Sequence, residues 1–135
     1  MKLSQLIACK EPLASLEIKG VTDDSRKVKE GFCFVNTQND NAYVKDAVSK
    51  GAVAVVNGED CDFENTLTVE NTKKAYAKIT SNWFSNPTDD LILIGVTGTN
   101  GKTSITYMLR AILEYTGEKV GVIGTVGNYI DGETI

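Results

Sequence analysis

The sequence predicts an α/β protein built as a small α/β domain over residues 1–88, followed over 89–135 by the first βαβ unit of a second domain. Short apolar runs rich in β-branched residues alternate with segments of helical spacing. A polar, proline-bearing stretch at 85–90 leads directly into a new apolar run, which indicates a domain boundary. The 41% hydrophobic and 24% charged residues are typical of a folded protein.

The first domain is expected to hold four short strands and three helices. The strands are predicted at 16–21 (at an edge of the sheet or half buried), 32–35, 52–56 and 66–69. The first helix is predicted at 2–8, and the second runs from an N-cap at Asn41 to Lys50. The third begins at an N-cap at Asn71, and its apolar face includes Ala75, Ile79 and Trp83. On this helical period Trp83 is expected to pack in the core or between domains rather than stack on a base.

In the second domain the apolar run Leu91–Ile94 predicts a strand buried on both faces. A helix is expected over 104–115, with Tyr107, Met108, Ala111 and Ile112 on its inner face. A second buried strand is expected over 118–125, followed by a strand and turn over 127–133.

A glycine-rich loop joins the first of these strands to the helix. Its sequence, Thr-Gly-Thr-Asn-Gly-Lys-Thr over 97–103, is typical of a phosphate-binding loop, although Val96 stands where the strict motif has glycine. Backbone N–H groups at a helix start favour an anion, so ATP is the predicted ligand. The predicted ATP-binding residues are Gly98, Thr99, Asn100, Gly101, Lys102, Thr103 and Ser104. The alternative is a tight turn without a ligand.

Two residues of this loop carry the expected chemistry. Lys102 is expected to reach the β and γ phosphates and is the candidate catalytic residue, since it steadies charge that moves to the leaving ADP. The Thr103 hydroxyl is the candidate ligand of the Mg²⁺ that accompanies ATP.

A second polar segment, 22–28, follows the first predicted strand. Strand ends often carry binding residues. Taken alone, the residue types of Asp23-Asp24-Ser25-Arg26 predict a solvated turn in which the Ser25 or Asp24 side chain bonds to its own backbone.

Charge and cysteine content exclude other classes. The formal net charge of −4 and the absence of a basic stripe argue against a nucleic-acid partner. The three scattered cysteines and the absence of histidine argue against a zinc site or a disulfide framework and fit a reducing cytoplasm. No apolar run is long enough to span a membrane, so no membrane partner is expected.

The 97–103 loop resembles the ATP loop of the Mur ligases and their folate-ligase relatives, which carry T-G-T-N-G-K-[ST]. Gly-Val-Ile-Gly-Thr at 121–125 is similar to the strand that follows that loop. The segment from Asp24-Ser25-Arg26 to Phe34-Val35 resembles the opening of the uridine-nucleotide domain of the tripeptide-forming Mur ligases. The resemblance implies that Ser25 binds the UDP part of the substrate, with Asp23 and Asp24 as neighbours.

The sequence departs from that family between Val35 and the next helix. A longer loop with a V-D-G-[HR] element is usual there, whereas this chain has only residues 36–42. Gln38 and Asn39 are the candidates to replace its contacts.

The resemblance further implies an ATP-dependent ligase of cell-wall synthesis whose second domain is the Mur ligase central domain. Its partners are expected to be ATP with Mg²⁺, UDP-N-acetylmuramoyl-dipeptide and a diamino acid, either diaminopimelate or lysine. ATP would convert the D-glutamyl carboxylate to an acyl phosphate, which the amine attacks. The resemblance covers only the first domain and the opening of the second of a three-domain enzyme, so the 135 residues are expected to be an inactive, monomeric fragment.

Two rival interpretations stay open. Another Mur or folylpolyglutamate-type ligase would share the loop, although folate ligases begin almost directly at it and lack the Asp24-Ser25-Arg26 domain. The chain could also be a nucleotide-binding module without turnover.

Overall fold

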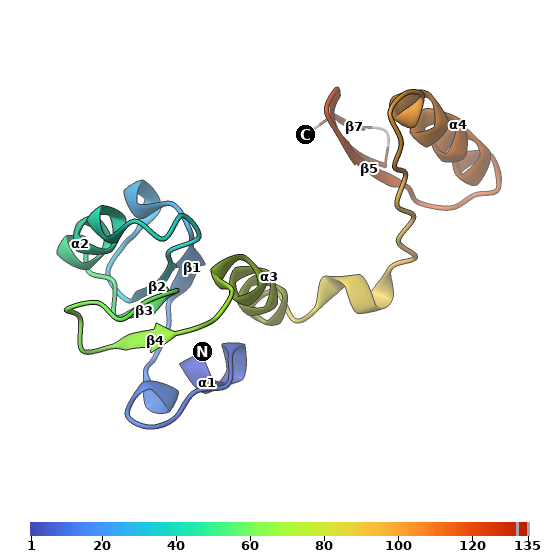
Figure 1. The fold of residues 1–135 in the computed structure, drawn as a ribbon. Helices are drawn as coiled ribbons and strands as arrows, with labels where there is room; N and C mark the ends of the chain where they lie inside the picture. Colours follow the sequence, from blue (N-terminus) through green and yellow to red (C-terminus); the bar gives the residue numbers. More distant parts are fainter. Residues whose placement is uncertain (132, 135) are drawn as a thin grey trace. The chain divides into compact units, whose positions relative to one another are not determined.

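The computed structural model describes residues 1–131 and 133–134. They fall into two units, Met1–Leu91 and Ile92–Ile135 (Figure 1). The division lies just beyond the boundary expected after residue 88.

The first unit is built on a parallel four-stranded sheet with the strands in sequence order (Figure 1). The strands are β1 (Gly20–Thr22), β2 (Phe32–Val35), β3 (Ala54–Asn57) and β4 (Thr66–Thr68). All four residues of β3 are buried, as suits a strand with a neighbour on each side. β1 lies at an edge, which confirms the expected edge strand, although it is shorter than predicted.

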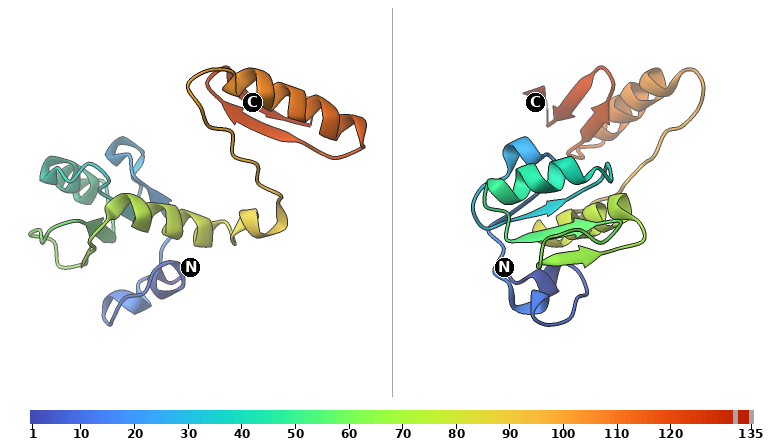
Figure 2. Two further views of the ribbon diagram at one scale, coloured as in Figure 1. Left: turned by 45° about the vertical axis from the view of Figure 1, so that its right-hand side comes forward. Right: turned by 60° about the vertical axis from the view of Figure 1, so that its left-hand side comes forward.

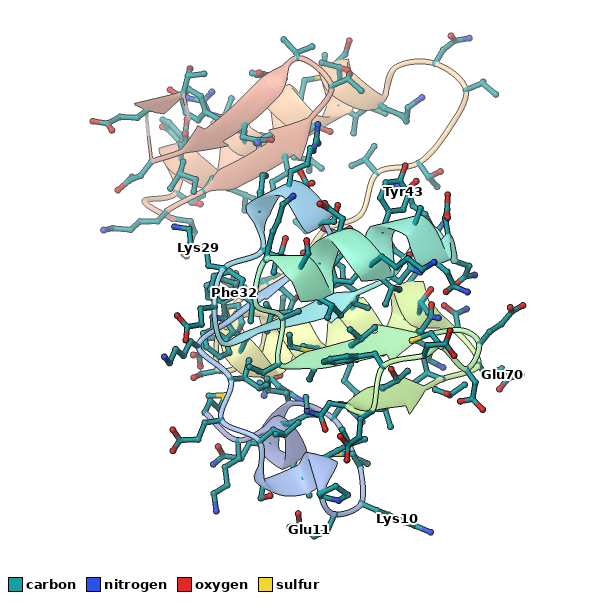
Figure 3. The ribbon with its side chains drawn as sticks, turned by 90° about the vertical axis from the view of Figure 1, so that its left-hand side faces the viewer. Lys10, Glu11, Lys29, Phe32, Tyr43 and Glu70 are labelled. Atoms are coloured by element: carbon teal, nitrogen blue, oxygen red, sulfur yellow. The ribbon has the colours of Figure 1, made fainter. Side chains whose placement is uncertain are left out.

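Helices cover both faces of this sheet (Figure 2). One hydrophobic cluster joins β2 and β3 to α1 (Leu3–Leu6) and α3 (Thr72–Trp83) through Cys33, Val35 and Ile79, among others. The other joins Phe34 and Val55 to α2 (Asn41–Ser49). Alternate strand residues therefore enter opposite layers, and Figure 3 shows α2 and α3 on the two sides of the sheet with charged side chains such as Lys29 and Glu70 at the periphery.

The helix caps explain where α2 and α3 begin. Asn71 caps α3 by accepting a hydrogen bond from the Lys74 N–H at 2.9 Å, which confirms the prediction. The predicted cap of α2 at Asn41 is wrong. Asp40 has the extended backbone of an N-cap, and its carboxylate accepts from the Ala42 N–H at 2.9 Å.

The remaining first-unit elements are short. The helix expected over 2–8 is a single turn, α1, and the strand expected from residue 16 contributes only an isolated bridge between Lys2 and Glu17 before β1. Three 3₁₀ turns occur, η1 (Leu13–Ser15), η2 (Ser25–Lys27) and η3 (Pro87–Asp90). Trp83 packs against the first cluster, as expected.

The described residues of the second unit form one helix and an antiparallel sheet. Its elements are α4 (Lys102–Tyr115), β5 (Gly121–Gly124), β6 (Gly127–Ile130) and β7 (Glu133–Thr134). The guanidinium of Arg110 on α4 lies 3.3 Å from the centre of the Tyr129 ring on β6 and pairs with Glu114 at 2.8 Å. This contact ties the helix to the sheet. Gly132, within the strand and turn expected over 127–133, lies outside the described residues.

The prediction of a buried strand at 91–94 is wrong. The segment is not assigned as a strand, and Ile92 and Leu93 are 95% and 69% exposed. No described strand pairs with it, and β5 pairs antiparallel with β6, so the described residues do not complete a βαβ unit. An apolar strand stays buried only between neighbours that bond its backbone and cover its faces.

The predictions of a buried inner face on α4 and of a buried strand over 118–125 are also wrong, because neighbouring strands that would cover them are missing among the described residues. Met108 and Ile112 are 64% and 61% exposed. Within β5 only Val122 is buried. The apolar pattern of α4 is present, but among the described residues no complete sheet covers it.

Candidate phosphate loop and strand-edge site

The glycine-rich loop turns sharply into α4. The chain bends over 98–100, and Gly101 takes a left-handed conformation, with φ at 76°, immediately before the helix starts at Lys102. A side chain at this φ would be strained, so glycine is the residue that allows the turn. The loop is neither extended nor helical throughout.

The start of α4 differs from the starts of α2 and α3 in having no side-chain cap. The Asp40 side chain accepts from one N-terminal N–H of α2, and the Asn71 side chain accepts from one of α3. The first N–H groups of a helix have no intrahelical partner, and they carry the positive end of the helix dipole. The beginning of α4 is therefore open to an anion.

Lys102 and Thr103 lie together at this helix start. The Lys102 ammonium folds back over the loop and donates to the carbonyl oxygens of Gly98 at 2.6 Å and Thr99 at 3.4 Å. Both residues line a cavity of about 160 Å³, together with Val96, Tyr107 and the segment 122–127. The second unit thus brings a cation and a hydroxyl to one cavity, directly after the bent glycine loop.

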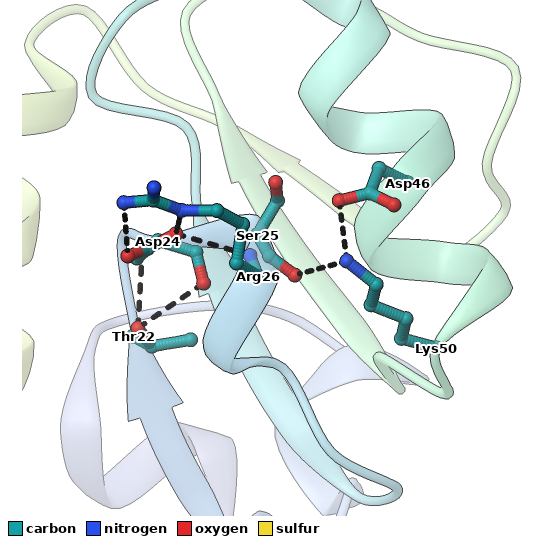
Figure 4. A network of polar contacts seen from close by, with 6 residues as sticks. All are labelled: Thr22, Asp24, Ser25, Arg26, Asp46 and Lys50. Carbon is teal, nitrogen blue, oxygen red and sulfur yellow. Dashed lines mark hydrogen bonds and ion pairs between the residues drawn. The ribbon is translucent and has the colours of Figure 1, made fainter.

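The second group of predicted residues lies after β1, at the carboxyl edge of the parallel sheet (Figure 4). Asp24 caps η2, and its carboxylate accepts from Arg26 through the backbone N–H at 3.0 Å and through Nε and Nη2, both at 2.9 Å. The bidentate Arg26 side chain is the main reason that the pKa of Asp24 falls to about 2. Asp24 is therefore an ionised, fully engaged acceptor at neutral pH.

Ser25 is buried against α2, with 6% of its surface exposed. Its carbonyl oxygen accepts from Lys50 Nζ at 3.2 Å, and the same ammonium pairs with Asp46 at 2.7 Å (Figure 4). Lys50 first, and then the Ser25 hydroxyl, lowers the pKa of Asp46. Ser25 therefore belongs to a polar network on the α2 side of the sheet.

The Asp23 side chain lies on the side of the sheet opposite to α2, near α3. Its carboxylate accepts from the Thr37 hydroxyl at 3.4 Å. Burial first, and then the nearby Asp23 charge, raises the pKa of Tyr76 on α3. Asp23 and Ser25 are close in sequence but are directed to opposite layers, with Asp24 between them.

Two further polar residues at this edge were missed from the sequence. Asn36 follows β2 and Asn57 ends β3, and each is only 1% exposed. Asn36 Nδ2 donates to Asn57 Oδ1 at 2.9 Å and to the Asp40 carbonyl at 3.1 Å, while Asn57 Nδ2 donates to Asn41 Oδ1 and the Glu59 carbonyl. The available signal was a Val-Asn pair at the end of each of two adjacent apolar strands.

The candidate replacements for the shortened loop are placed differently. Gln38 is exposed, and Asn39 is in a left-handed conformation with its Oδ1 accepting from Thr72 at 3.5 Å. Among the described residues no group of three metal-ligating side chains occurs. Within the same residues no helix is long and apolar enough to cross a membrane.

Comparison with known proteins identifies the family. The Mur ligase middle domain matches residues 96–135, the part that carries the glycine loop and α4. A ligase of Caldanaerobacter subterraneus subsp. tengcongensis, named UDP-N-acetylmuramoyl-L-alanyl-D-glutamate--2,6-diaminopimelate ligase, is 46% identical over 128 residues, which is 90% of this chain. The chain belongs to the Mur ligase family. A Bacteroides fragilis ligase of the same name is 39% identical across all of this Mur ligase chain.

The chain spans 27% of the Caldanaerobacter protein and 30% of the Bacteroides protein. Solved structures agree on the fold. A structure titled as a UDP-N-acetylmuramoyl-L-alanyl-D-glutamate--2,6-diaminopimelate ligase covers 99% of this chain with a TM-score of 0.81 and 22% identity, over 29% of its own length. A MurF ligase from Thermotoga maritima in complex with ADP covers 79% with a TM-score of 0.54 and 23% identity, over 25% of its own length. The α/β class is thereby confirmed.

Proposed function

We propose that this chain is the N-terminal part of an ATP-dependent ligase that adds 2,6-diaminopimelate to UDP-N-acetylmuramoyl-L-alanyl-D-glutamate in cell-wall synthesis. The observation that carries the proposal is the uncapped start of α4, with Lys102 and Thr103 in one cavity, inside the residues matched by the Mur ligase middle domain. The names of the relatives favour diaminopimelate over lysine. Because the chain spans under a third of those relatives, the reaction belongs to the whole protein.

The loop suits the phosphates of ATP. Residues Gly98 to Ser104 supply backbone N–H groups at a helix start, and the left-handed Gly101 leaves no side chain in the way. Lys102 exchanges its bonds to the loop carbonyls for the β and γ phosphates and steadies the charge that develops on ADP. ATP supplies the phosphoryl group that activates the D-glutamyl carboxylate for attack by the amine.

Mg²⁺ would take one oxygen from the Thr103 hydroxyl. Octahedral Mg²⁺ keeps several waters and is commonly bound by few protein groups together with substrate phosphates. The described residues contain no acidic cluster to complete the shell, so phosphates, water and residues outside this chain would provide the rest.

The first unit would hold the UDP part of the substrate at the carboxyl edge of its sheet. Ligands of open parallel sheets bind outside the carboxyl ends of the strands, where Asp23, Asp24 and Ser25 lie. Ser25 is the proposed anchor, and Asp23 and Asp24 are its neighbours. We expect the complete enzyme to act as a monomer in the cytoplasm, where ATP is available.

Thermal denaturation tests the proposal that the first unit binds the UDP part of the substrate. The chain's single tryptophan, Trp83, packs in the first unit, so its fluorescence follows that unit alone. UDP-N-acetylmuramoyl-dipeptide should raise the melting temperature, whereas the dipeptide without UDP should not. No UDP-dependent shift would contradict the proposal for this unit.

The ATP site and turnover need separate measurements. We expect Mg-ATP binding by calorimetry to weaken at least tenfold in Lys102→Met. Phosphate release with all substrates present should be undetectable from these 135 residues and measurable from a full-length relative. Ligation by the chain alone would show that the catalytic groups are not distributed as proposed.

A further inference from the structure

The amide cluster at the carboxyl edge contains one unsatisfied atom. Both hydrogens of Asn36 Nδ2 are used, one by Asn57 Oδ1 and one by the Asp40 carbonyl. Asn36 Oδ1 is buried and accepts no hydrogen bond from any described residue. Flipping the amide would set this oxygen against two acceptors, so the hydrogen-bond network fixes its orientation.

A buried acceptor without a donor costs about 1–3 kcal/mol, and such groups in folded proteins usually have a partner from outside the chain. Among the described residues Thr80 Oγ1 is also buried without a partner, but it is a helix hydroxyl that can turn toward its own backbone. Asn36 cannot do this, because its amide is held at both donors. Its oxygen lies where open parallel sheets bind ligands.

The surroundings favour a neutral donor. Asn57 and Asn41, which form the cluster with Asn36, are uncharged amides, and the carboxylate of the adjacent Asp40 is engaged by the Ala42 N–H. A diphosphate would find no free cation in this cluster. The uracil ring is neutral, and its N3–H is the one N–H donor of UDP.

We propose that Asn36 Oδ1 accepts a hydrogen bond from the uracil N3–H, which makes Asn36 the residue that selects uracil over cytosine. This inference rests on the proposed function of the first unit as a uridine-nucleotide site. Cytosine carries an acceptor at N3, so it would face the Asn36 oxygen with lone pairs on both sides. A site built to pair a buried polar group rejects a ligand that leaves the group unpaired.

Asn36 Oδ1 is buried, so a ligand reaches it only when a neighbouring segment shifts. The side-chain contacts that tie residues 37–39 to the unit are long, 3.4 Å from Thr37 to Asp23 and 3.5 Å from Thr72 to Asn39. A displacement of 37–39 that leaves Asp40 in place therefore breaks only these two side-chain contacts and keeps the Asp40 cap of α2. On this proposal Asn36, rather than Gln38 or Asn39, replaces the nucleotide contacts of the longer family loop.

Ligand analogues test the inference without altering the protein. Calorimetry of the 135-residue chain should give similar affinities for UDP and 5-methyl-UDP, and affinities at least tenfold weaker for 3-methyl-UDP and CDP. Equal affinities for UDP and 3-methyl-UDP would overturn the inference. Equal weakening by both methyl groups would do the same, because it would indicate bulk rather than a lost donor. Absence of UDP binding would instead overturn the proposed function itself.

Variants provide the complementary test. Asn36→Ala removes the acceptor and should reduce the preference for UDP over CDP to near unity. Trp83 fluorescence establishes that each variant is folded, and if Asn36→Ala unfolds, the analogue series decides alone. Gln38→Ala should leave the preference intact. A loss of preference in Gln38→Ala, or its retention in folded Asn36→Ala, would overturn the inference.

Discussion

Replacing Asn57 by alanine should destabilise the first unit more than any surface substitution. Asn57 is 1% exposed and makes three side-chain hydrogen bonds, which join the end of β3 to Asn36, Asn41 and the Glu59 carbonyl. At about 1 kcal/mol for each bond, the loss is about 3 kcal/mol. A unit of this size has a free energy of unfolding of about 5–14 kcal/mol, so the change is a large fraction of it.

Urea denaturation followed by Trp83 fluorescence measures this change. The chain contains one tryptophan, and it packs in the first unit, so unfolding of the second unit does not contribute to the signal. In a thermal experiment the same loss corresponds to a shift of about 12–24 °C. The slope of the urea transition should stay constant, since the folded surface is unchanged.

Gln38→Ala is the matched control. It removes an exposed amide from the same edge and should change the free energy of unfolding by less than about 0.5 kcal/mol. If Asn57→Ala also falls within 1 kcal/mol of the unaltered chain, the amide cluster does not hold the strand ends together. The bond from Asn57 would then no longer fix the orientation of the Asn36 amide.

Three further outcomes are expected. Arg26 lowers the pKa of Asp24 to about 2, so the contribution of Asp24 to stability is present above pH 4 and is lost as the pH falls toward 2. Asp24→Asn should flatten this part of a plot of stability against pH, and an unchanged plot would contradict the pairing with Arg26. Burial raises the pKa of Cys33 to about 12, so iodoacetamide at pH 8 should modify it only in urea, as mass spectrometry of the labelled peptide would show. Ile79→Ala, at a position with no exposed surface, should cost about 2–5 kcal/mol in urea denaturation, and a cost below 1 kcal/mol would argue against its place in the core.

The first unit was predictable from sequence because its signals are local. Apolar runs located β2, β3 and β4, and Asn71 correctly marked the start of α3. The error at α2 was one residue, because Asp40 and Asn41 are both good caps and only backbone geometry separates them.

The strand at 91–94 could not be judged in the same way. Four consecutive apolar residues favour a buried strand only if neighbouring strands bond to their backbone, and that pairing depends on distant sequence. The same dependence explains why the apolar face of α4 stays exposed.

The candidate sites divide similarly. The residues of the phosphate loop were predictable because the motif is contiguous, and the turn into α4 occurs where expected. Their roles as ligand contacts stay predictions. Asn36 and Asn57 were not found, since they become neighbours only through the register of two strands that are separated by α2.

The exposed run at 91–94 also has a colloidal consequence. An exposed apolar segment that no described strand pairs with offers a template on which a second molecule can add edge to edge. Asp89 and Asp90 stand immediately before it, in the position where charged residues oppose such stacking through mutual repulsion. Concentrated solutions of this chain should therefore stay clear longest at low salt, and should cloud as added salt screens those two charges.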